Sequence, residues 1–414
     1  MKKKILAGML VFAMVCSLGA CSGEKSNPKD TKEGKEGVLE QEVVKWNYGT
    51  SGNVLVTIAE EKGYFEDEGI QIDPVEANAN ADAMTLLATG KVDVVSNAGT
   101  SNPLQQIASG VDISVFGGHM IEGCMPVVAK KGTEWKGIES FIGKKVAVNP
   151  SYFAFTGAVM DLGYENPLEV VDWEIYSDYN DALAAVVRGD VTYALMGTGQ
   201  NLAVQDMAAN GEIDIVSYQS EIMENYSCCR MVAQTDWIND NPNTVKAIIR
   251  ALLRAQSWYE ANKEEAVKLH AAAIEATEEY VGAYMLDDEH YFVSVDPLKD
   301  GVVRAWDILD KTGYLGEDNN VKIEDHINTE LYEEALKEAT EKYGEEAPEF
   351  YEEMAAFFQE HDKEAILQER DHEYSKSISK KILDYMLYIH WVSGIIYFFD
   401  KQWIGKSIFV PVNR

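Results

Sequence analysis

Short apolar runs and amphipathic segments alternate along two stretches of the chain, at about residues 43–116 and 145–216. Short apolar or alternating runs are typical of strands, whereas segments with apolar residues every three or four positions are typical of helices. A strand, a helix and a second strand in this order form a parallel βαβ unit. The alternation therefore predicts an α/β fold built from two such series.

Glycines, prolines and polar residues mark the ends of the predicted elements. In the first stretch, strands are expected at 43–48, 70–75, 92–95 and 113–116, and helices at 53–62, 81–89 and 103–108. In the second stretch, strands are expected at 145–148, 170–175, 191–196 and 213–216, and helices at 156–162, 179–187 and 200–209. Further helices are expected at 241–258, 263–273, 277–287, 297–312 and 329–343.

Two similar apolar segments, Met125–Ala129 and Met231–Ala233, bracket the second stretch. We interpret them as strands that carry the chain from one lobe to the other and back. Because the chain is too long for one small domain, two lobes are expected. The predicted limits are 43–124 and 232–345 for lobe I, 125–231 for lobe II, and 346–414 for a helical C-terminal extension.

The N-terminus resembles a bacterial lipoprotein signal. Three lysines precede an apolar run from Ile5 to Ser17, which is short for a permanent membrane helix, and Gly19-Ala20 stand directly before Cys21. The resemblance implies that residues 1–20 are removed and that a lipid on Cys21 anchors the protein outside the cell membrane. An ordinary secretory signal with a chance cysteine is the alternative. Residues 21–42 are polar, which predicts a flexible tether.

The net charge and the cysteine and histidine patterns exclude several classes of function. A formal charge of -33 argues against nucleic-acid partners and against electrostatic adhesion to anionic lipid. No G-x-S-x-G, P-loop or H-E-x-x-H motif is present, so no catalytic residue, metal or cofactor is predicted. Beyond the signal, Cys124, Cys228 and Cys229 are either three buried thiols or include one disulfide from Cys124. Surface positions are expected for His270, His290 and His326.

Four loops that follow predicted strands are rich in small hydroxyl or amide residues, and each leads into a helix. In open α/β sheets, ligands bind outside the carboxyl ends of the strands, and in two lobes those ends face each other across a cleft. Ordinary helix capping is the alternative for any one loop, but four equivalent loops favour a shared cleft. The candidate ligand-binding residues in these loops are Thr50, Ser51, Asn97, Ala98, Gly99, Thr100, Ser151, Tyr152, Phe153, Gly197 and Thr198.

Aromatic residues accompany these loops. Trp46 and Tyr48 on the first strand, with Tyr152 in the second lobe, are candidates for stacking on a planar ligand, at about 0.5–1.5 kcal/mol each beyond area burial. Packing within the lobes is the alternative role. His119 either borders the cleft or caps the hinge, and Arg230 either neutralises an anionic ligand or pairs with nearby acids.

Four segments in order resemble the solute-binding components of ABC importers for nitrate, sulfonates, taurine and thiamine-precursor pyrimidines, the NMT1/THI5-like group. Residues 61–70 (EKGYFEDEGI) resemble its kGyFeeeGl segment, and residues 86–94 (LLATGKVDV) its aLaaGkiDvg segment. Residues 143–148 (GKKVAV) resemble the strand that opens the second lobe. Residues 183–194 resemble the group's aL..GdvDa pattern, which is a repeat of the aLaaGkiDvg segment in the second lobe. The resemblance covers about residues 43–341.

This resemblance implies a two-lobed, type II periplasmic-binding-protein-like α/β fold, each lobe a mostly parallel sheet flanked by helices, with two crossover strands as the hinge. It implies a monomeric protein, not an enzyme, that captures a small ligand between the lobes and delivers it to an ABC permease and its ATPase. The aromatic set favours a thiamine-precursor pyrimidine or a similar small heterocycle. Alternative ligands are a sulfonate, taurine or nitrate. Alternative functions are a lipid-anchored ligand sensor or a single-turnover pyrimidine synthase. Fungal relatives with that synthase activity have a cysteine-rich iron motif, which Cys228-Cys229 matches poorly.

The C-terminal residues 376–414 have an inverted composition. They contain six Lys or Arg and two Asp, a net charge of +4. The rest of the chain therefore carries a net charge of -37, and the two parts sum to -33. This basic, aromatic tail suits a segment that lies on a membrane or on a partner, or a divergent end with little role in function.

Overall fold

The computed structural model describes residues 37–49, 53–77, 80–316 and 319–364, which form one compact unit. The predicted signal peptide, the lipid site Cys21, most of the tether and the basic tail lie outside these residues. None of the helices in the described residues has the length and apolar character needed to cross a bilayer.

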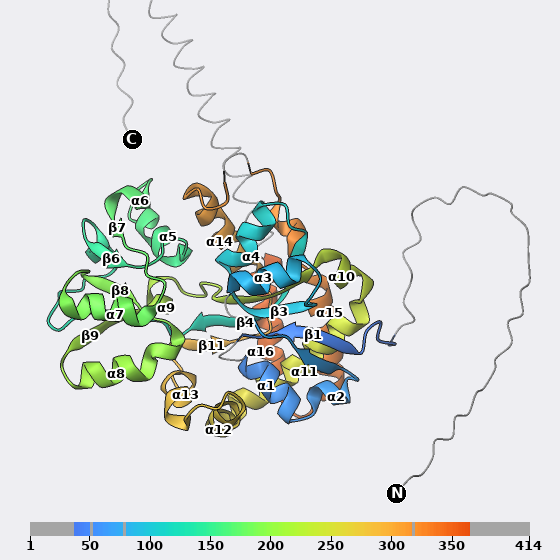
Figure 1. Ribbon diagram of the computed structural model, residues 1–414. Helices are drawn as coiled ribbons and strands as arrows, with labels where there is room; N and C mark the ends of the chain where they lie inside the picture. Colours follow the sequence, from blue (N-terminus) through green and yellow to red (C-terminus); the bar gives the residue numbers. More distant parts are fainter. Residues whose placement is uncertain (1–36, 50–52, 78–79, 317–318, 365–414) are drawn as a thin grey trace, which may run out of the picture. The chain divides into compact units, whose positions relative to one another are not determined.

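Six strands form the first sheet, in the order β11-β4-β10-β3-β1-β2 (Figure 1). β1 pairs in parallel with β2 and with β3, whereas β10 lies antiparallel between β3 and β4, and β11 is antiparallel to β4. The bounds are β1 Val43–Asn47, β2 Gln71–Pro74, β3 Val94–Gly99, β4 Ile113–Gly123, β10 Cys229–Gln234 and β11 Tyr291–Val293.

Five strands form the second sheet, in the order β7-β6-β8-β5-β9, drawn in green in Figure 1. β6 pairs in parallel with β7 and β8, and β5 is antiparallel to β8 and β9. The bounds are β5 Pro126–Lys130, β6 Lys145–Ala147, β7 Asp172–Trp173, β8 Tyr193–Leu195 and β9 Ile213–Tyr218.

Helices flank both sheets, so the predicted α/β class is confirmed. All the predicted helices are present, with ends shifted by up to three residues. Several short elements were not predicted, because they are too brief to show a period. The helices are α1 Val54–Glu61, α2 Tyr64–Asp67, α3 Asn80–Ala88, α4 Ser101–Ala108, α5 Phe153–Asp161, α6 Pro167–Val170, α7 Tyr179–Arg188, α8 Asn201–Ala209, α9 Gln219–Ile222, α10 Thr235–Asp240, α11 Pro242–Ala261, α12 Lys263–Ala273, α13 Glu278–Met285, α14 Lys299–Lys311, α15 Glu330–Tyr343 and α16 Pro348–Phe358, with 3-10 turns η1 Ile138–Phe141, η2 Thr198–Gln200 and η3 Ile323–His326 and a π-helical end η4 Gln359–Glu364.

Both sheets are mixed rather than mostly parallel, which corrects the expectation. Four of the five antiparallel pairs among the described strands involve β5 or β10, strands that enter a sheet from the other half of the molecule. Parallel pairing needs a crossover within the same sheet, usually a helix, and these two strands arrive without one.

The segment 96–101, predicted as a loop, is partly strand. β3 continues to Gly99, because β10 pairs beside it with Ala98 opposite Arg230 and Gly99 opposite Cys229. The partner strand comes from a distant part of the sequence, so the local pattern of small residues gave no sign of it.

The chain passes between the two sheets at two strained connections. Cys124 joins β4 to β5 with a φ of 48°, and the return from α9 to β10 contains Asn225 at 48° and Ser227 at 59°. Positive φ is uncommon for residues other than glycine. The segments predicted as crossover strands are β5 and β10, each of which lies within one sheet. The proposed lobe limits remain a prediction, and the one at 231/232 falls inside β10.

Side-chain packing continues from one half of the described unit to the other. A hydrophobic cluster includes Leu104 and Trp306 of the first half together with Phe155 of the second. Helices α5 and α14 approach closely at Gly157, where an added Cβ would lie 2.6 Å from Ile308 Cδ1. A side chain at position 157 would force the side chain of Ile308 to shift.

A buried carboxylate ties helix α2 to α11 and α15. The Glu68 side chain is only 3% exposed and accepts hydrogen bonds from Arg250 Nε at 2.9 Å, Lys342 Nζ at 2.8 Å and Tyr343 Oη at 2.6 Å. Burial raises the pKa of Glu68, but the three donors outweigh it and hold the pKa below its ordinary value.

Replacement of Glu68 by Gln should destabilise the fold in a pH-dependent way. Because the folded pKa is lowered, the carboxylate contributes stability above its unfolded pKa, and this contribution is lost as the pH falls through the folded pKa. We expect Glu68→Gln to lower the free energy of unfolding by about 3 kcal/mol at about pH 7, and by less at about pH 3, in urea titrations. The exposed neighbour Glu66→Gln is the matched control, within about 0.5 kcal/mol of the parent. An equal loss at both pH values would contradict this account.

Candidate ligand-binding site

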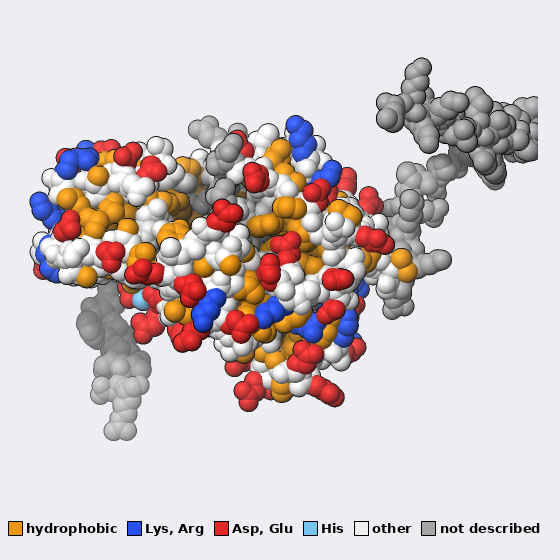
Figure 2. All heavy atoms as spheres, turned by 60° about the horizontal axis from the view of Figure 1, so that its bottom comes forward, with side chains coloured by type: hydrophobic (Ala, Val, Ile, Leu, Met, Phe, Trp, Pro, Cys, Tyr) orange, Lys and Arg blue, Asp and Glu red, His pale blue; other side chains and the backbone are white. Residues whose placement is uncertain are grey.

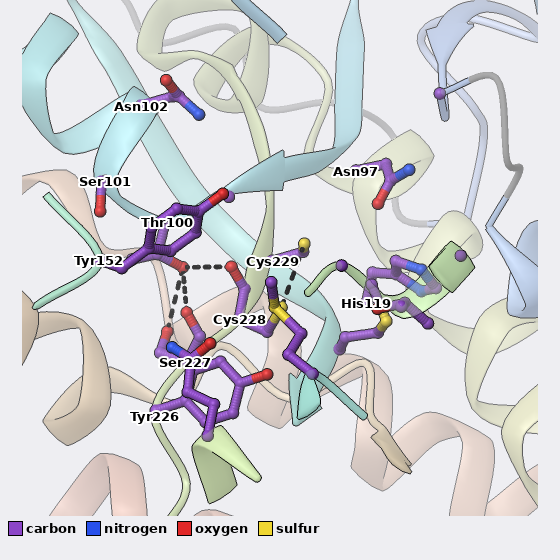
Figure 3. Close-up of a pocket in the computed structure, with 18 of the residues that line it drawn as sticks. Asn97, Thr100, Ser101, Asn102, His119, Tyr152, Tyr226, Ser227, Cys228 and Cys229 are labelled. Carbon is purple, nitrogen blue, oxygen red and sulfur yellow. Dashed lines mark hydrogen bonds between the residues drawn. The ribbon is translucent and has the colours of Figure 1, made fainter. Parts of the chain in front are cut away.

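A cavity of about 550 Å³ lies between the first sheet with its helices and the helices and turns next to the second sheet (Figure 3). Its walls come from β3, β4, β10, β11, α4, α12 and α13 on one side, and from α5, α7, η2 and α9 on the other. None of the described residues that line it is Asp, Glu, Lys or Arg. The size is that of a small-molecule site, and the lining is polar but without a fixed ionic charge.

The wall from the first half contains Asn97, Gly99 and Thr100, all predicted from the sequence. Thr100 holds the return connection in place: its Oγ1 donates to the carbonyl oxygen of Ser227 at 2.5 Å, and its N–H donates to that of Cys228 at 3.0 Å. Figure 3 shows these residues converging on one side of the cavity. The start of α4 is thereby fixed against β10.

The wall from the second half contains Ser151, Tyr152 and Phe153 at the start of α5, as predicted. Tyr152 Oη and Tyr179 Oη share a hydrogen bond of 2.8 Å. Burial raises the pKa of both phenols, so both keep their protons at neutral pH. These rings offer aromatic surface and hydroxyl groups without charge.

Gly197 and Thr198, also predicted, complete this wall between β8 and η2. An added Cβ at Gly197 would lie 2.6 Å from a ring carbon of Tyr179, so glycine is required for this approach. The Thr198 hydroxyl donates to the carbonyl oxygen of Gly123 in the strained connection.

Direct hydrogen bonds join the two halves beside the cavity. Ser101 Oγ donates to the carbonyl oxygen of Ser151 at 2.6 Å, which brings the first turns of α4 and α5 together. Gln205 Nε2 of α8 donates to the carbonyl oxygen of Ala283 in α13 at 3.0 Å. The structure therefore holds the two halves in contact.

Three tyrosines that the sequence analysis missed form a further wall. Tyr280 and Tyr284 come from α13, and Tyr291 comes from β11. The helix predicted at 277–287 was assigned no binding role, and the short strand β11 was not predicted. The spacing of Tyr280 and Tyr284 by four residues, which places both on one helix face, was the signal that could have identified them.

Two buried polar side chains on the lining have atoms without a hydrogen-bond partner among the described residues. They are Nδ1 of His119 and Oε1 of Gln219, and each residue is 2% exposed. Burial lowers the pKa of His119 to about 3, with nearby His270 and Arg230 acting in the same direction, so the imidazole is neutral at neutral pH. Unpartnered buried polar atoms are costly, and a bound molecule could satisfy them.

The structure does not bring every candidate to the cavity. Trp46 is fully buried in the core, where its Nε1 donates to Ser96 Oγ at 2.8 Å, and Ala98 is fully buried as well. Tyr48 packs against the core and is absent from the described lining. Thr50 and Ser51 lie outside the described residues. Ligand binding by the candidates that do line the cavity remains a prediction.

Two of the three histidines expected at the surface are buried or packed. His270 is 2% exposed, lines the cavity and contacts Thr57 Oγ1 of α1 at 3.3 Å. His290 stacks on the ring of Tyr218 with centroids 3.7 Å apart and bonds to Asp287. Both expectations were wrong, because distant elements cover these side chains.

Arg230 takes neither of its two expected roles. It is fully buried and donates to the main-chain oxygens of Met120 at 2.7 Å, Asp296 at 3.0 Å and Pro297 at 3.1 Å. It therefore fixes β10 against β4 and the segment after β11. Its Nε has no partner among the described residues.

The three described cysteines are free thiols. Cys228 and Cys229 line the cavity, and their sulfurs are 3.7 Å apart. In the described part of the chain, no three His, Cys, Asp or Glu side chains are grouped so that they could hold a metal ion.

Solved structures share this architecture. The periplasmic aliphatic sulphonate binding protein SsuA from Escherichia coli matches with a TM-score of 0.57 and 17% identity, over 70% of this chain and 92% of that one. The periplasmic nitrate-binding protein NrtA from Synechocystis PCC 6803 matches with a TM-score of 0.56 and 15% identity, over 72% and 89%. The predicted periplasmic-binding-protein-like fold is thus confirmed; at such identities the likeness concerns the fold alone.

Similarity in sequence points to proteins of thiamine biosynthesis. The 4-amino-5-hydroxymethyl-2-methylpyrimidine phosphate synthase of Schizosaccharomyces pombe is 22% identical over 214 residues, 49% of this chain and 60% of that protein, so the match spans less than two thirds of that relative. A putative thiamine biosynthesis protein of Haemophilus influenzae is 24% identical over 220 residues, 53% of this chain and 68% of that protein. A family model described as NMT1/THI5 like matches residues 53–266, more than half of the chain. The chain therefore belongs to the NMT1/THI5-like family.

Proposed function

We propose that this protein is an extracytoplasmic solute-binding protein that captures a small nitrogen heterocycle, such as a thiamine-precursor pyrimidine, and delivers it to an ABC permease. The observation that carries the proposal is the lining of the cavity, which combines tyrosine rings, amide groups and hydroxyl groups without a carboxylate, Lys or Arg among its described residues. The names of the related thiamine proteins support the same ligand class.

The chemistry of the lining matches a neutral, planar ligand. Six tyrosines border the cavity, and each ring that stacks on a ligand contributes about 0.5–1.5 kcal/mol beyond area burial. Neutral amides and phenols can pair with ring nitrogens and amino groups, and such contacts provide specificity. The six are Tyr152, Tyr179, Tyr226, Tyr280, Tyr284 and Tyr291.

A sulfonate, taurine or nitrate is the second candidate. The first turns of α4 and α5 both border the cavity, and the N-termini of helices attract anions. The solved sulfonate- and nitrate-binding proteins have the same fold. We rank this candidate lower, because no cationic side chain in the described lining would balance an anion and His119 is neutral.

The remaining parts of the proposal concern location and activity. Periplasmic relatives and the predicted lipoprotein signal with Cys21 support an extracytoplasmic, lipid-anchored protein whose partners are a permease and its ATPase. The acidic side chains spread over the face shown in Figure 2 fit a body that is not held to membrane lipid by charge. Because one relative is named a synthase, catalysis on a bound pyrimidine is the competing activity.

Thermal-shift measurements on the purified full chain distinguish the ligand classes. We expect 4-amino-5-hydroxymethyl-2-methylpyrimidine to raise the Tm, because a ligand at 100 times its Kd stabilises the folded state by about 2.7 kcal/mol. Taurine and nitrate should leave the Tm unchanged. A shift with taurine or nitrate alone would reverse the ranking, and no shift with any of them would reject the proposed ligand classes.

Gln219 should contribute to affinity and not to folding. We expect its unpartnered Oε1 to accept a hydrogen bond from an amino group of the ligand. Gln219→Leu should weaken pyrimidine binding about tenfold or more in calorimetric titrations, while the free energy of unfolding without ligand stays equal or rises, because a buried unpaired oxygen is removed. Ile222→Val, in the same helix but outside the lining, is the control. Unchanged affinity of Gln219→Leu would remove this residue from the site.

A further inference from the structure

We propose that Cys228 is a reactive thiol that captures low-molecular-weight disulfides entering the cavity and holds them as a mixed disulfide. Cys228 is half-buried on the cavity wall and stands beside a second thiol, Cys229, whose sulfur is 3.7 Å away. His119 lines the same cavity, and its buried Nδ1 has no partner among the described residues, an independent sign that the cavity is built to hold a molecule.

Both main-chain polar groups of Cys228 are hydrogen-bonded, so the position of its Cα is fixed. Its N–H donates to the carbonyl oxygen of Ile121 in β4 at 3.0 Å, and its carbonyl oxygen accepts from the N–H of Thr100 at 3.0 Å. The preceding Ser227 has a φ of 59°. Strain of this kind persists only where the surroundings enforce it, and it is common at functional sites.

Two donors are directed at the sulfur of Cys228. The thiol of Cys229 donates to it at 3.7 Å. A Cβ built on Gly123 would lie 2.9 Å from the Cys228 sulfur and 3.2 Å from Tyr226 Oη. The thiol and the phenol oxygen therefore both lie next to this glycine. Because Tyr226 Oη accepts the N–H of Gly123 at 2.7 Å, its own proton is free to point at the sulfur. Both donors stabilise a thiolate.

The charge environment separates Cys228 from the other two described thiols. The Cys229 hydrogen bond, the Tyr226 phenol and the buried guanidinium of Arg230 hold the pKa of Cys228 below its ordinary value, although burial acts against them. Cys229 has a raised pKa. Burial and nearby Asp287 raise the pKa of Cys124 well above its usual range. Since the thiolate is the nucleophile, reaction is expected at Cys228.

The reaction is a thiol–disulfide exchange that needs no further oxidant. The Cys228 thiolate attacks one sulfur of a small disulfide RSSR, a new S–S bond forms, the old S–S bond breaks, and RS⁻ leaves and takes up the proton lost by Cys228. The net change is one thiol and one disulfide converted into a mixed disulfide and RSH. Because the bound group occupies the cavity, it competes with the ligand of the proposed function. This competition is the only part of the inference that rests on the proposed function.

The test uses cystamine, a small disulfide, with the full chain in a Cys16→Ser/Cys21→Ser background, which leaves the three described thiols. We expect the folded protein to take up one cysteamine, located on Cys228 by peptide mass mapping, about tenfold faster than the other two thiols react. Cys124→Ser and Cys229→Ser should still take up one at the fast rate, whereas Cys228→Ser should take up cysteamine only at the rate of the other two thiols, about tenfold more slowly. Circular dichroism confirms that each variant folds, and Cys228→Ala serves if the serine variant does not.

Labelling of Cys124 or Cys229 at the same rate, or no labelling before unfolding, would overturn the proposal. A second arm adds 4-amino-5-hydroxymethyl-2-methylpyrimidine before cystamine. Slower labelling supports a ligand in the same cavity. Fast labelling of Cys228 that the pyrimidine does not slow supports the reactive thiol and counts against the proposed ligand, so failures of the two proposals remain distinguishable.

Discussion

The antiparallel insertion of β10 between β3 and β4 is the constraint on which the rest of the structure depends. It returns the chain from the second sheet to the centre of the first and buries Arg230 against the main chain of β4 and of the segment after β11. The same pairing turns the end of β3 from a loop into a strand and sets Thr100 against Ser227 and Cys228. One strand therefore joins the two halves and supplies one wall of the cavity.

The chemistry of the cavity follows from this arrangement. Main-chain groups near the return connection are largely paired with one another, so the side chains facing the space are neutral amides, hydroxyls, thiols and tyrosine rings. The described lining contains no ionic pair that a ligand would have to displace. Burial keeps Tyr152 and Tyr179 protonated and His119 uncharged at neutral pH.

Sequence reasoning predicted the order of strands and helices well, because each βα unit carries its own local pattern. It placed Asn97, Gly99, Thr100, Ser151, Tyr152 and Thr198 in loops that the structure brings together. It misplaced Trp46, since an alternating strand does not reveal which face the rest of the chain will cover. It missed Tyr284, Tyr291 and Gln219, whose positions depend on how distant helices dock and not on their neighbours in sequence.

The contacts Ser101–Ser151 and Gln205–Ala283 join the two halves, and Ser101 and Ser151 also line the cavity. If a molecule reaches the cavity only once such contacts have opened, separation of the halves precedes association. At high solute concentration the observed binding rate would then level off at the rate of that opening. The polar contacts between the halves would thereby limit how fast the protein can sample its surroundings, whatever its affinity for the solute.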